Sequence, residues 1–441
     1  MALPSLHALT EHVRRLLPHR PRLAAMFESC LTSTLETTVR PQSDGTTFVI
    51  TGDIPAMWLR DSAAQVRPYL LLAPSDPAAS DLIAGVVRRQ VEYVLHDPYA
   101  NAFNETASGA RWEDDQTEMS DLVWERKYEV DSLCAVLHLA FQLWRATGRT
   151  DHLDTRFRAA AALILEVWRR EQRHEAESPY RFVRTAWQER GQLPRGGLGS
   201  PIAETGMTWS GFRPSDDACR YGYLVPSNMY AVVVLGHLER LADEVLDDLD
   251  LLREARSLAA SIQAGLDAHA KVEHPEFGTI YAYEVDGLGN YLLMDDANVP
   301  SLLSLPYLGS CAQDDPLYLN TRRFVLSRAN PYFYSGRAAA GVGSPHTPTG
   351  YVWPIALAIQ GLTATDDVER LEMLRLLETT DAGTLWMHES FSADDPRRFT
   401  RPWFSWANAM LCELVLHGCG ITVPGAALEA ISAPLLEQVN A

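Results

Sequence analysis

Apolar residues recur at helical spacing along most of the 441-residue chain. In the segment 227–245 they repeat every three or four positions, while acidic and basic residues fill another face. The same spacing predicts fourteen helices of about 12 to 20 residues. They cover 5–16, 21–36, 62–72, 78–95, 127–147, 151–173, 227–245, 248–270, 292–306, 315–329, 353–362, 367–379, 402–417 and 425–438. Few segments alternate as strands do, so the sequence predicts an all-α protein.

Local start and stop signals flank several of these segments. Ser62 to Gln65 is typical of a capping box, and Ser227 is a candidate N-cap. Pro402 suits the first position of a helix that Gly418 would end. These signals set the predicted helix boundaries.

Long irregular stretches rich in Gly, Pro, Trp and His separate the helices, at 40–61, 97–126, 174–226, 272–291, 330–352 and 381–401. Such stretches are typical of functional loops on a rigid scaffold. Because they recur after every second helix, we expect an α/α toroid of alternating inner and outer helices. An irregular bundle and a solenoid are the alternatives, but no clear repeat of 20 to 50 residues supports a solenoid. No linker divides the chain, which predicts a single domain over 1–441.

Composition narrows the function classes. No run of about 20 apolar residues predicts a membrane span, and the first residues lack the pattern of a secretory signal. Six cysteines without a CxxC pair are expected to be reduced, with Cys219 the one candidate for a reactive thiol. We therefore expect a cytoplasmic protein. A net charge of −19 disfavours nucleic acid and anionic lipid as partners and favours a neutral substrate.

Two acidic blocks indicate the chemistry. Asp216 and Asp217 end the run that starts at Arg213, and Glu389 lies between His388 and Ser390. Tryptophan, tyrosine and arginine surround both blocks, and neither forms an apolar helical face. Paired carboxyl groups among aromatic residues are typical of sites that cleave glycosidic bonds, where one carboxyl group protonates the leaving oxygen and the other activates water or attacks carbon.

Three further blocks are candidate sugar subsites, each with a structural alternative. Trp58, Arg60 and Asp61 precede a predicted helix, where the charged pair could form only a local salt bridge. Glu125, Glu129 and Asp131 stand among aromatics, although Asp131 could cap a helix. His346 lies in a Gly-rich loop and could bond backbone instead of a hydroxyl group. The blocks are 51–62, 124–132 and 341–354.

Other kinds of site have little support. Asp295, Asp296 and Asn298 lack the pattern of an EF-hand calcium loop. The chain has no HExxH motif and no clustered His-Cys set. It also lacks the GxSxG elbow of serine hydrolases.

Five runs resemble glycoside hydrolase family 125, the bacterial and fungal exo-α-1,6-mannosidases. They are TGDIPAMWLRDS, WERKYEVDSL, GFRPSDDACRYGYLVPSNM, GSPHTPTGYVWP and HESFSADDPRRFTRPWFSWAN, and they span residues 51–408. The resemblance implies an (α/α)6 barrel. It also implies removal of single terminal mannose units from an α-1,6-linked manno-oligosaccharide or N-glycan fragment, with inversion and without a metal or other cofactor.

The resemblance also assigns catalytic roles. It implies that Asp216 is the general acid, with Asp217 as the fallback, and that Glu389 is the general base. The acid must hold a proton near neutral pH, for which desolvation or a neighbouring carboxylate such as Asp217 is needed. The base must stay ionised, beside Arg397, Arg398, Arg401 or His388. Inversion requires carboxyl groups about 6.5 to 9.5 Å apart, against about 5 to 5.5 Å for retention.

We expect the remaining site residues to bind the terminal mannose. Arg60, Asp61, Glu129 and His346 would bind hydroxyl groups, and Trp58 and Trp406 would shape the pocket. Asp131, Arg213 and Asp217 complete the predicted contact set. Two alternatives stay open: an exo-acting α-glycosidase of another specificity on the same toroid, and a glycan-binding protein without activity.

Overall fold

The computed structural model of the protein describes residues 3–185, 190–424 and 427–428. Its α-helices are α1 (Pro4–Leu16), α2 (Pro21–Ser33), α3 (Leu59–Val66), α4 (Pro77–His96), α5 (Val130–Thr147), α6 (Thr155–Glu171), α7 (His174–Glu177), α8 (Pro194–Gly197), α9 (Val225–Leu241), α10 (Leu249–His269), α11 (Leu305–Leu308), α12 (Pro316–Val325), α13 (Pro354–Leu362), α14 (Asp367–Thr379) and α15 (Ser405–Gly418). Three short helical turns continue α2, α3 and α9: η1 (Thr34–Thr38), η2 (Arg67–Leu71) and η3 (Ala242–Leu246).

The strands of the described residues are two to four residues long and pair antiparallel in small separate sheets. They are β1 (Val39–Pro41), β2 (Thr47–Val49), β3 (Met57–Trp58), β4 (Ala102–Phe103), β5 (Val123–Glu125), β6 (Tyr223–Leu224), β7 (Lys271–His274), β8 (Gly278–Tyr281), β9 (Glu284–Val285), β10 (Tyr291–Leu292), β11 (Phe333–Ser335), β12 (Ala340–Val342), β13 (Tyr351–Val352), β14 (Ser390–Ser392) and β15 (Phe399–Thr400). Three sheets have three strands, in the orders β3-β4-β5, β10-β9-β6 and β13-β14-β15.

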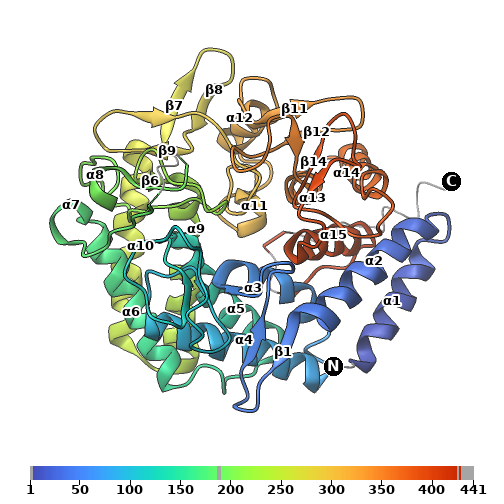
Figure 1. Cartoon of the computed structure of the whole chain (residues 1–441), viewed down its shortest axis with the longest axis horizontal. Helices are drawn as coiled ribbons and strands as arrows, with labels where there is room; N and C mark the ends of the chain where they lie inside the picture. Colours follow the sequence, from blue (N-terminus) through green and yellow to red (C-terminus); the bar gives the residue numbers. More distant parts are fainter. Residues whose placement is uncertain (1–2, 186–189, 425–426, 429–441) are drawn as a thin grey trace.

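The helices form two concentric rings, as the toroid prediction requires. Around the centre lie α3, α5, α9, α11, α13 and α15, and outside them lie α2, α4, α6, α10, α12 and α14 (Figure 1). Within the inner ring α5 contacts α3 and α9, and α15 contacts α13 and α3. The outer helices α4, α10 and α14 pack on α5, α9 and α13. This arrangement is an (α/α)6 barrel, and the predicted fold class is confirmed.

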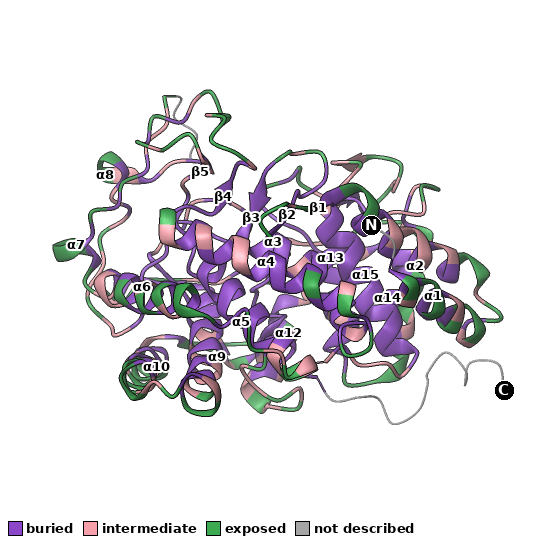
Figure 2. Ribbon diagram, turned by 90° about the horizontal axis from the view of Figure 1, so that it is seen from below, coloured by how far each residue is buried: buried purple, intermediate pink, exposed green. Residues whose placement is uncertain are grey.

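Burial follows the two rings. Every residue of α15 is buried, whereas α10 buries only a stripe: Leu251, Ala255, Leu258, Ile262, Gly265 and Leu266. That stripe has the three- and four-residue spacing of a helix with one covered face. Figure 2 shows the same contrast, with the inner helices buried and α10 exposed along its outer side. The amphipathic pattern therefore identifies outer helices, and continuous apolar sequence identifies inner ones.

The inner helices begin at one rim of the barrel. Strand β3 leads directly into α3 and β6 into α9, and a single residue separates β13 from α13. Figure 2 shows β3, β4 and β5 together on one side of the helices. Residues just before these helices, or in their first turns, therefore meet at this rim.

Several local predictions are wrong. Residues 292–304 form no helix, because Asp295 accepts hydrogen bonds from the backbone of Leu302 and Leu303 and Pro300 cannot donate one. Ser62 and Ser227 lie inside α3 and α9 rather than at their N-caps, and α15 begins three residues after Pro402. The predicted helix at 425–438 falls outside the described residues, except for 427–428.

None of the described helices is long and apolar enough to cross a membrane. Cys30, Cys134, Cys219, Cys311 and Cys412 are free thiols. Burial raises the pKa of Cys219 well above its usual range, which argues against a reactive thiolate at that position.

Candidate active site

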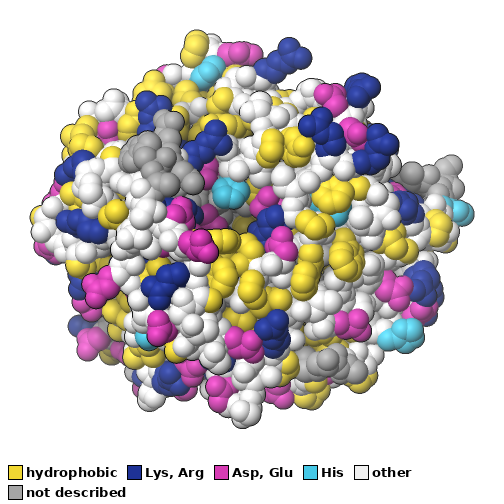
Figure 3. All heavy atoms as spheres, viewed as in Figure 1, with side chains coloured by type: hydrophobic (Ala, Val, Ile, Leu, Met, Phe, Trp, Pro, Cys, Tyr) yellow, Lys and Arg dark blue, Asp and Glu magenta, His cyan; other side chains and the backbone are white. Residues whose placement is uncertain are grey.

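A cavity of about 370 Å³ opens at the rim where the inner helices begin. Both candidate catalytic carboxyl groups, on Asp216 and Glu389, line it. Trp58, Arg60, Asp61, His346 and Trp406 line it as well. In the space-filling view, acidic, basic and histidine side chains gather near the middle of this face, beside hydrophobic ones (Figure 3). The sequence blocks that were predicted to act together therefore converge on one pocket.

Asp216 lies at the tip of a tight turn. The backbone N–H of Asp216 donates to Arg213 O at 2.9 Å, and that of Arg213 donates to Asp217 O at 2.8 Å. Pro214 suits the first central position of such a turn. Asp216 has a φ of 65°, a left-handed conformation that favours glycine and that Asp tolerates better than most residues. An aspartate in this strained position is typical of a functional residue.

Arg60 is the centre of the acidic cluster beside Asp216. Its Nη1 donates to Glu129 Oε2 at 2.6 Å and to Asp131 Oδ2 at 2.9 Å. Its Nη2 lies 3.5 Å from Asp61 Oδ2 and 3.9 Å from Asp216 Oδ1. Burial lowers the pKa of Arg60, but the four carboxyl groups more than offset it and raise the pKa well above its usual range. Arg60 is therefore a fixed positive charge under the pocket.

Asn101 and Lys127 approach Asp216 from the side of β4 and β5. Asn101 Nδ2 donates to Asp216 Oδ1 at 3.0 Å and to Glu125 Oε2 at 3.1 Å. Lys127 Nζ lies 3.1 Å from Glu125 Oε1. Burial lowers the pKa of Lys127, and the attraction of Glu125 and Asp216 raises it overall. A buried amide thus holds the Asp216 side chain, and a buried ammonium group attracts it.

The proton balance of the cluster differs from the prediction. Burial raises the pKa of Asp216, but Lys127, Arg60 and a hydrogen bond with Glu129 bring it below its usual value. Burial, together with Asp216 and Asp131, raises the pKa of Glu129 well above its usual value despite Arg60. Carboxyl groups that interact this closely titrate as a pair. The two groups therefore titrate together, with the pKa of Glu129 raised and that of Asp216 lowered.

The Asp217 side chain contacts His346, whereas the sequence suggested Asp217 as the carboxylate that raises the pKa of Asp216. Asp217 Oδ1 lies 3.0 Å from His346 Nδ1. Burial lowers the pKa of His346, but Asp217, Glu389 and Asp216 raise it to about 9. His346 is therefore positively charged at neutral pH. The carboxyl groups that interact with Asp216 include those of Glu129, Asp61 and Glu125.

Glu389 has a simpler environment. Arg401 Nη1 lies 3.6 Å from Glu389 Oε1, so Arg401 is the charge partner among the four predicted candidates. Arg401 Nη2 also donates to Asp53 Oδ1 at 2.6 Å, which fixes its guanidinium. Arg397 pairs with Asp395 instead, and the His388 ring stacks on Phe399. Arg401 is thus a held cation that faces the candidate base, and the charged His346 also attracts it.

Unsatisfied polar atoms line the pocket wall. Within the described residues, Trp58 Nε1 and Asp61 Oδ2 are buried without a hydrogen-bond partner. Burial raises the pKa of Asp61 to about 6 even though Arg60 lowers it. The Arg60 guanidinium lies over the Trp406 ring, with its Cζ atom 5.5 Å from the centroid of that ring. Buried polar groups without partners are costly, and hydroxyl groups of a bound sugar are suitable partners for them.

Four predicted contact residues do not line the cavity: Glu129, Asp131, Arg213 and Asp217. Glu129 and Asp131 hold Arg60, and Asp217 holds His346. Arg213 Nε donates to Glu284 Oε1 at 2.6 Å and anchors the base of the Asp216 turn. Their role as direct sugar contacts stays a prediction.

The sequence interpretation missed several residues that line the pocket, including Trp112, Lys127 and Arg184. Lys127 lies inside a block that had been singled out, so the block itself was the signal. Asn101 contacts Asp216 but does not itself line the cavity. It follows α4, in a stretch of sequence that carries no motif. Its role depends on contacts between segments far apart in the sequence.

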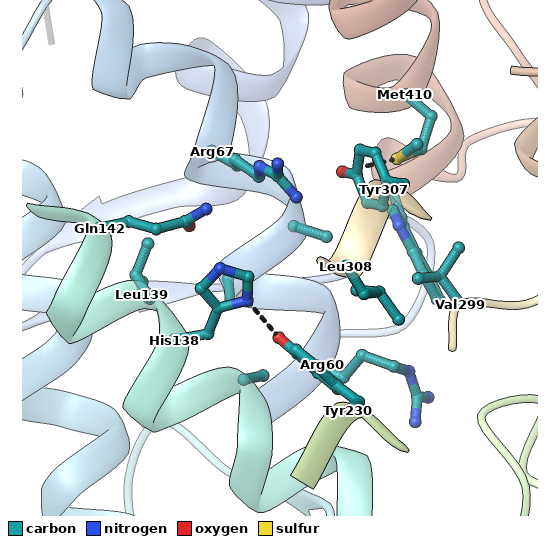
Figure 4. A pocket seen from close by; sticks show the side chains of 14 residues that line it. Arg60, Arg67, His138, Leu139, Gln142, Tyr230, Val299, Tyr307, Leu308 and Met410 are labelled. Atoms are coloured by element: carbon teal, nitrogen blue, oxygen red, sulfur yellow. Dashed lines mark hydrogen bonds between the residues drawn. The ribbon is translucent and has the colours of Figure 1, made fainter. Parts of the chain in front are cut away.

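A smaller cavity of about 50 Å³ lies deeper in the barrel and shares Arg60 and Trp406 with the first. Figure 4 shows Arg67 and His138 beside it, with His138 Nδ1 bonded to the Tyr230 hydroxyl group at 2.7 Å. Burial lowers the pKa of His138 well below its usual value. Arg60 and Trp406 therefore form the floor of the pocket. Among the described residues, no group of three or more His, Cys, Asp or Glu side chains is arranged to hold a metal ion.

Comparisons with known proteins agree with this site. The model of the metal-independent α-mannosidases (GH125) matches residues 20–416. The meiotically up-regulated gene 157 protein of Schizosaccharomyces pombe is 41% identical over 421 residues, covering 89% of this chain and 82% of that protein. A solved structure of a Streptococcus pneumoniae metal-independent α-mannosidase, in a non-productive complex with α-1,6-mannobiose, is 50% identical with a TM-score of 0.92. It covers 94% of this chain and 98% of that one.

Proposed function

The chain belongs to glycoside hydrolase family 125, the metal-independent α-mannosidases, and on this premise we propose that it releases terminal α-1,6-linked mannose with inversion. The pneumococcal α-mannosidase, half identical to this chain, supports the linkage because it was solved with α-1,6-mannobiose. We take the substrate to be a manno-oligosaccharide or an N-glycan fragment. The observation that carries the proposal is the meeting of Asp216 and Glu389 in one pocket, with Asp216 beside the carboxyl cluster around Arg60 and Glu389 beside Arg401.

In the proposed reaction Asp216 is the general acid and Glu389 the general base. Asp216 protonates the oxygen that links the terminal mannose to the next sugar, so that the leaving group departs as a neutral alcohol. Glu389 takes a proton from a water molecule that attacks the anomeric carbon from the opposite face. Arg401, 3.6 Å from Glu389, supports the ionised base. One bond to carbon forms while another breaks, and the product is β-mannose.

The acid receives its proton through Glu129. Glu129, whose pKa is raised, is buried, while Asp216 reaches the cavity. The leaving oxygen accepts a proton only from a group at the cavity surface. We propose that the proton passes from Glu129 to Asp216 as the substrate excludes water, since lost hydration favours the neutral form of Asp216. Lys127 and Arg60 then stabilise the carboxylate that Asp216 leaves behind.

The pocket wall provides the proposed contacts to mannose. Asp61 Oδ2 and Trp58 Nε1, both without hydrogen-bond partners in the described part of the chain, would accept from and donate to hydroxyl groups. The charged His346 and Arg60 would donate to others. Trp58 and Trp406 supply apolar faces to the ring. Partners fixed in this way would also reject an epimer, because its hydroxyl groups would leave buried atoms unpaired.

The proposal also covers the domain organisation and the cellular location of the protein. We regard residues 1–441 as one catalytic domain, because the main core cluster includes residues from Leu3 to Leu428. We also propose a cytoplasmic location, which the free thiols support.

The test is a panel of substrates digested with EDTA present: α-1,2-, α-1,3- and α-1,6-mannobiose and an aryl α-glucoside, with Glu389→Gln as the control. We expect mannose from α-1,6-mannobiose only, and none from the control. Cleavage of another linkage or of the glucoside would instead support an exo-α-glycosidase of another specificity. Binding of mannobiose without any release would support a glycan-binding protein.

A further inference from the structure

Asp296 is a buried carboxylate that the proposed reaction does not use. It lies between β10 and α11, in the segment that was predicted to be helical, and its exposed fraction is 0%. Asp296 Oδ1 accepts from the backbone and side-chain N–H groups of Asn298, at 3.3 and 3.1 Å. Its Oδ2 accepts from two serine hydroxyl groups, of Ser215 and Ser344. Four donors thus converge on one side chain without a direct ion pair.

The first serine belongs to the turn that carries the general acid. Ser215 Oγ donates to Asp296 Oδ2 at 3.0 Å, and Ser215 directly precedes Asp216. The φ of 65° at Asp216 is unfavourable for a non-glycine residue. The turn would therefore lose backbone strain by relaxing unless its tip is held. The Ser215 bond holds it.

The second serine belongs to the loop that carries His346. Ser344 Oγ donates to the same Asp296 oxygen at 3.1 Å and accepts from the His346 backbone N–H at 3.1 Å. A backbone bond of 3.1 Å from Ala297 N to Gly343 O holds the two segments together. His346 then reaches back to Asp217, next to the acid. The contacts close a ring: Asp296, Ser215, Asp216, Asp217, His346 and Ser344.

We propose that Asp296 is a positioning residue for the general acid, fixing the Asp216 turn against the His346 loop through Ser215 and Ser344. This inference rests on the proposed role of Asp216. The same Asp296 oxygen accepts from both hydroxyl groups, so both hydroxyl hydrogens point at it, and each serine then has one orientation. Acid catalysis depends on geometry at this scale, since a shift of about 1 Å in a reacting group costs roughly 10²-fold in rate.

The test compares two mannosides that differ in their need for an acid. Hydrolysis of α-1,6-mannobiose requires protonation of a poor leaving group, whereas 2,4-dinitrophenyl α-mannoside releases a phenolate that needs none. We expect Asp296→Asn, which leaves one accepting oxygen for donors that now reach two, to lower kcat for mannobiose by roughly 10²-fold. For the dinitrophenyl mannoside we expect a change of less than about threefold, and for both a small change in KM.

Asp295→Asn is the matched control. Asp295 is equally buried, but its carboxyl group accepts from the backbone N–H groups of Leu302 and Leu303. Neither leucine belongs to the site. Burial raises the pKa of Asp295 to about 8, so asparagine resembles its neutral form. We expect this variant to leave the ratio of the two rates unchanged.

If Asp296→Asn does not fold, Ser344→Ala removes one hydroxyl group of the ring and should show the same selectivity for leaving group at a smaller amplitude. Equal losses on both mannosides, unchanged rates, or the same ratio in Asp295→Asn would overturn the proposal. Failure of the wild-type protein to cleave either mannoside would instead count against the proposed function itself.

Discussion

The outer and inner helices of this barrel begin in different ways. Five of the six outer helices have an aspartate N-cap whose side chain accepts a backbone N–H: Asp76, Asp154, Asp248, Asp315 and Asp366. None of the six inner helices, all within the described residues, has a capping side chain. Three of them start instead after an aromatic residue that lines the pocket: Trp58, Trp353 and Phe404.

This difference separates stability from function. An N-cap stabilises a helix by about 1 kcal/mol, and the outer helices use that stabilisation. At the inner helix starts the acidic residues serve other partners: Asp61 faces the pocket, and Glu129 and Asp131 hold Arg60. The partial positive charge of a helix N-terminus still favours these carboxylates. The rim of the inner ring thus gives up local helix stability to carry the site.

The largest expected effect at the inner rim is that of Glu389→Gln. Loss of the base should lower kcat by roughly 10²- to 10⁴-fold for α-1,6-mannobiose and for 2,4-dinitrophenyl α-mannoside alike, because water must be activated whatever the leaving group. Steady-state rates on the two substrates measure this. Retention of most activity on either one would mean that another group serves as the base.

Asp216→Asn should have a similar effect on one substrate only. Asparagine tolerates the left-handed φ of this position, so the turn should keep its shape. We expect roughly 10²- to 10⁴-fold loss on mannobiose and a much smaller loss on the dinitrophenyl mannoside. Asp217→Asn is the comparison, since its carboxyl group bonds His346 rather than lining the cavity. A larger selective loss in Asp217→Asn would move the acid to that residue.

Glu129→Gln should shift the pH profile rather than abolish activity. In the variant Asp216, which reaches the cavity, takes its proton from solvent. The raised pKa of Glu129 is lost, and the pKa of Asp216, which Lys127 and Arg60 hold below its usual value, remains. The alkaline limb of kcat should therefore move to lower pH, by about one unit. Asp131→Asn, which removes a partner of Arg60 and one of the charges that raise the pKa of Glu129 but keeps the Glu129 carboxyl group, is the comparison and should move the limb less. A shift to higher pH in Glu129→Gln would contradict the shared proton.

Asp154→Ala should have the smallest effect, on stability alone. Asp154 accepts from the backbone of Arg156 and Phe157, both at 2.9 Å, at the start of outer helix α6. We expect the free energy of unfolding to fall by about 1 kcal/mol while kcat on mannobiose stays unchanged. Chemical denaturation and steady-state kinetics on one preparation measure both. A loss of activity without a loss of stability would contradict the division between the rings.

Much of the fold follows from the sequence because the outer helices are amphipathic. The prediction of 367–379 coincides with α14, and 248–270 differs from α10 by one residue at each end. The failures concentrate at the inner rim. Ser62 and Ser227 were taken as caps, but Ser62 lies within the first turns of α3 and Ser227 Oγ donates to Asp131. Local capping rules fail where polar residues make tertiary contacts instead.

The sequence predicted only part of the candidate site, because some of its residues act through tertiary contacts. Motif blocks identified Asp216, Glu389, Arg60 and His346, which all line one pocket. Asp296 was considered only as part of a calcium loop, and the helix predicted over 292–306 gave no sign of its four hydrogen bonds. No motif marks Asn101 either, because its contact with Asp216 joins residues 115 positions apart. Residues that orient the catalytic groups require the fold to be known.

The most direct test of the central claim is the anomer that the enzyme releases first. Hydrolysis of α-1,6-mannobiose with EDTA present, followed by proton NMR before mutarotation, reports the stereochemistry. The account predicts that β-mannose appears first, because water that Glu389 activates attacks opposite the oxygen that Asp216 protonates. Initial release of α-mannose would mean a retaining mechanism and would contradict the assignment of Asp216 and Glu389 as an inverting acid and base.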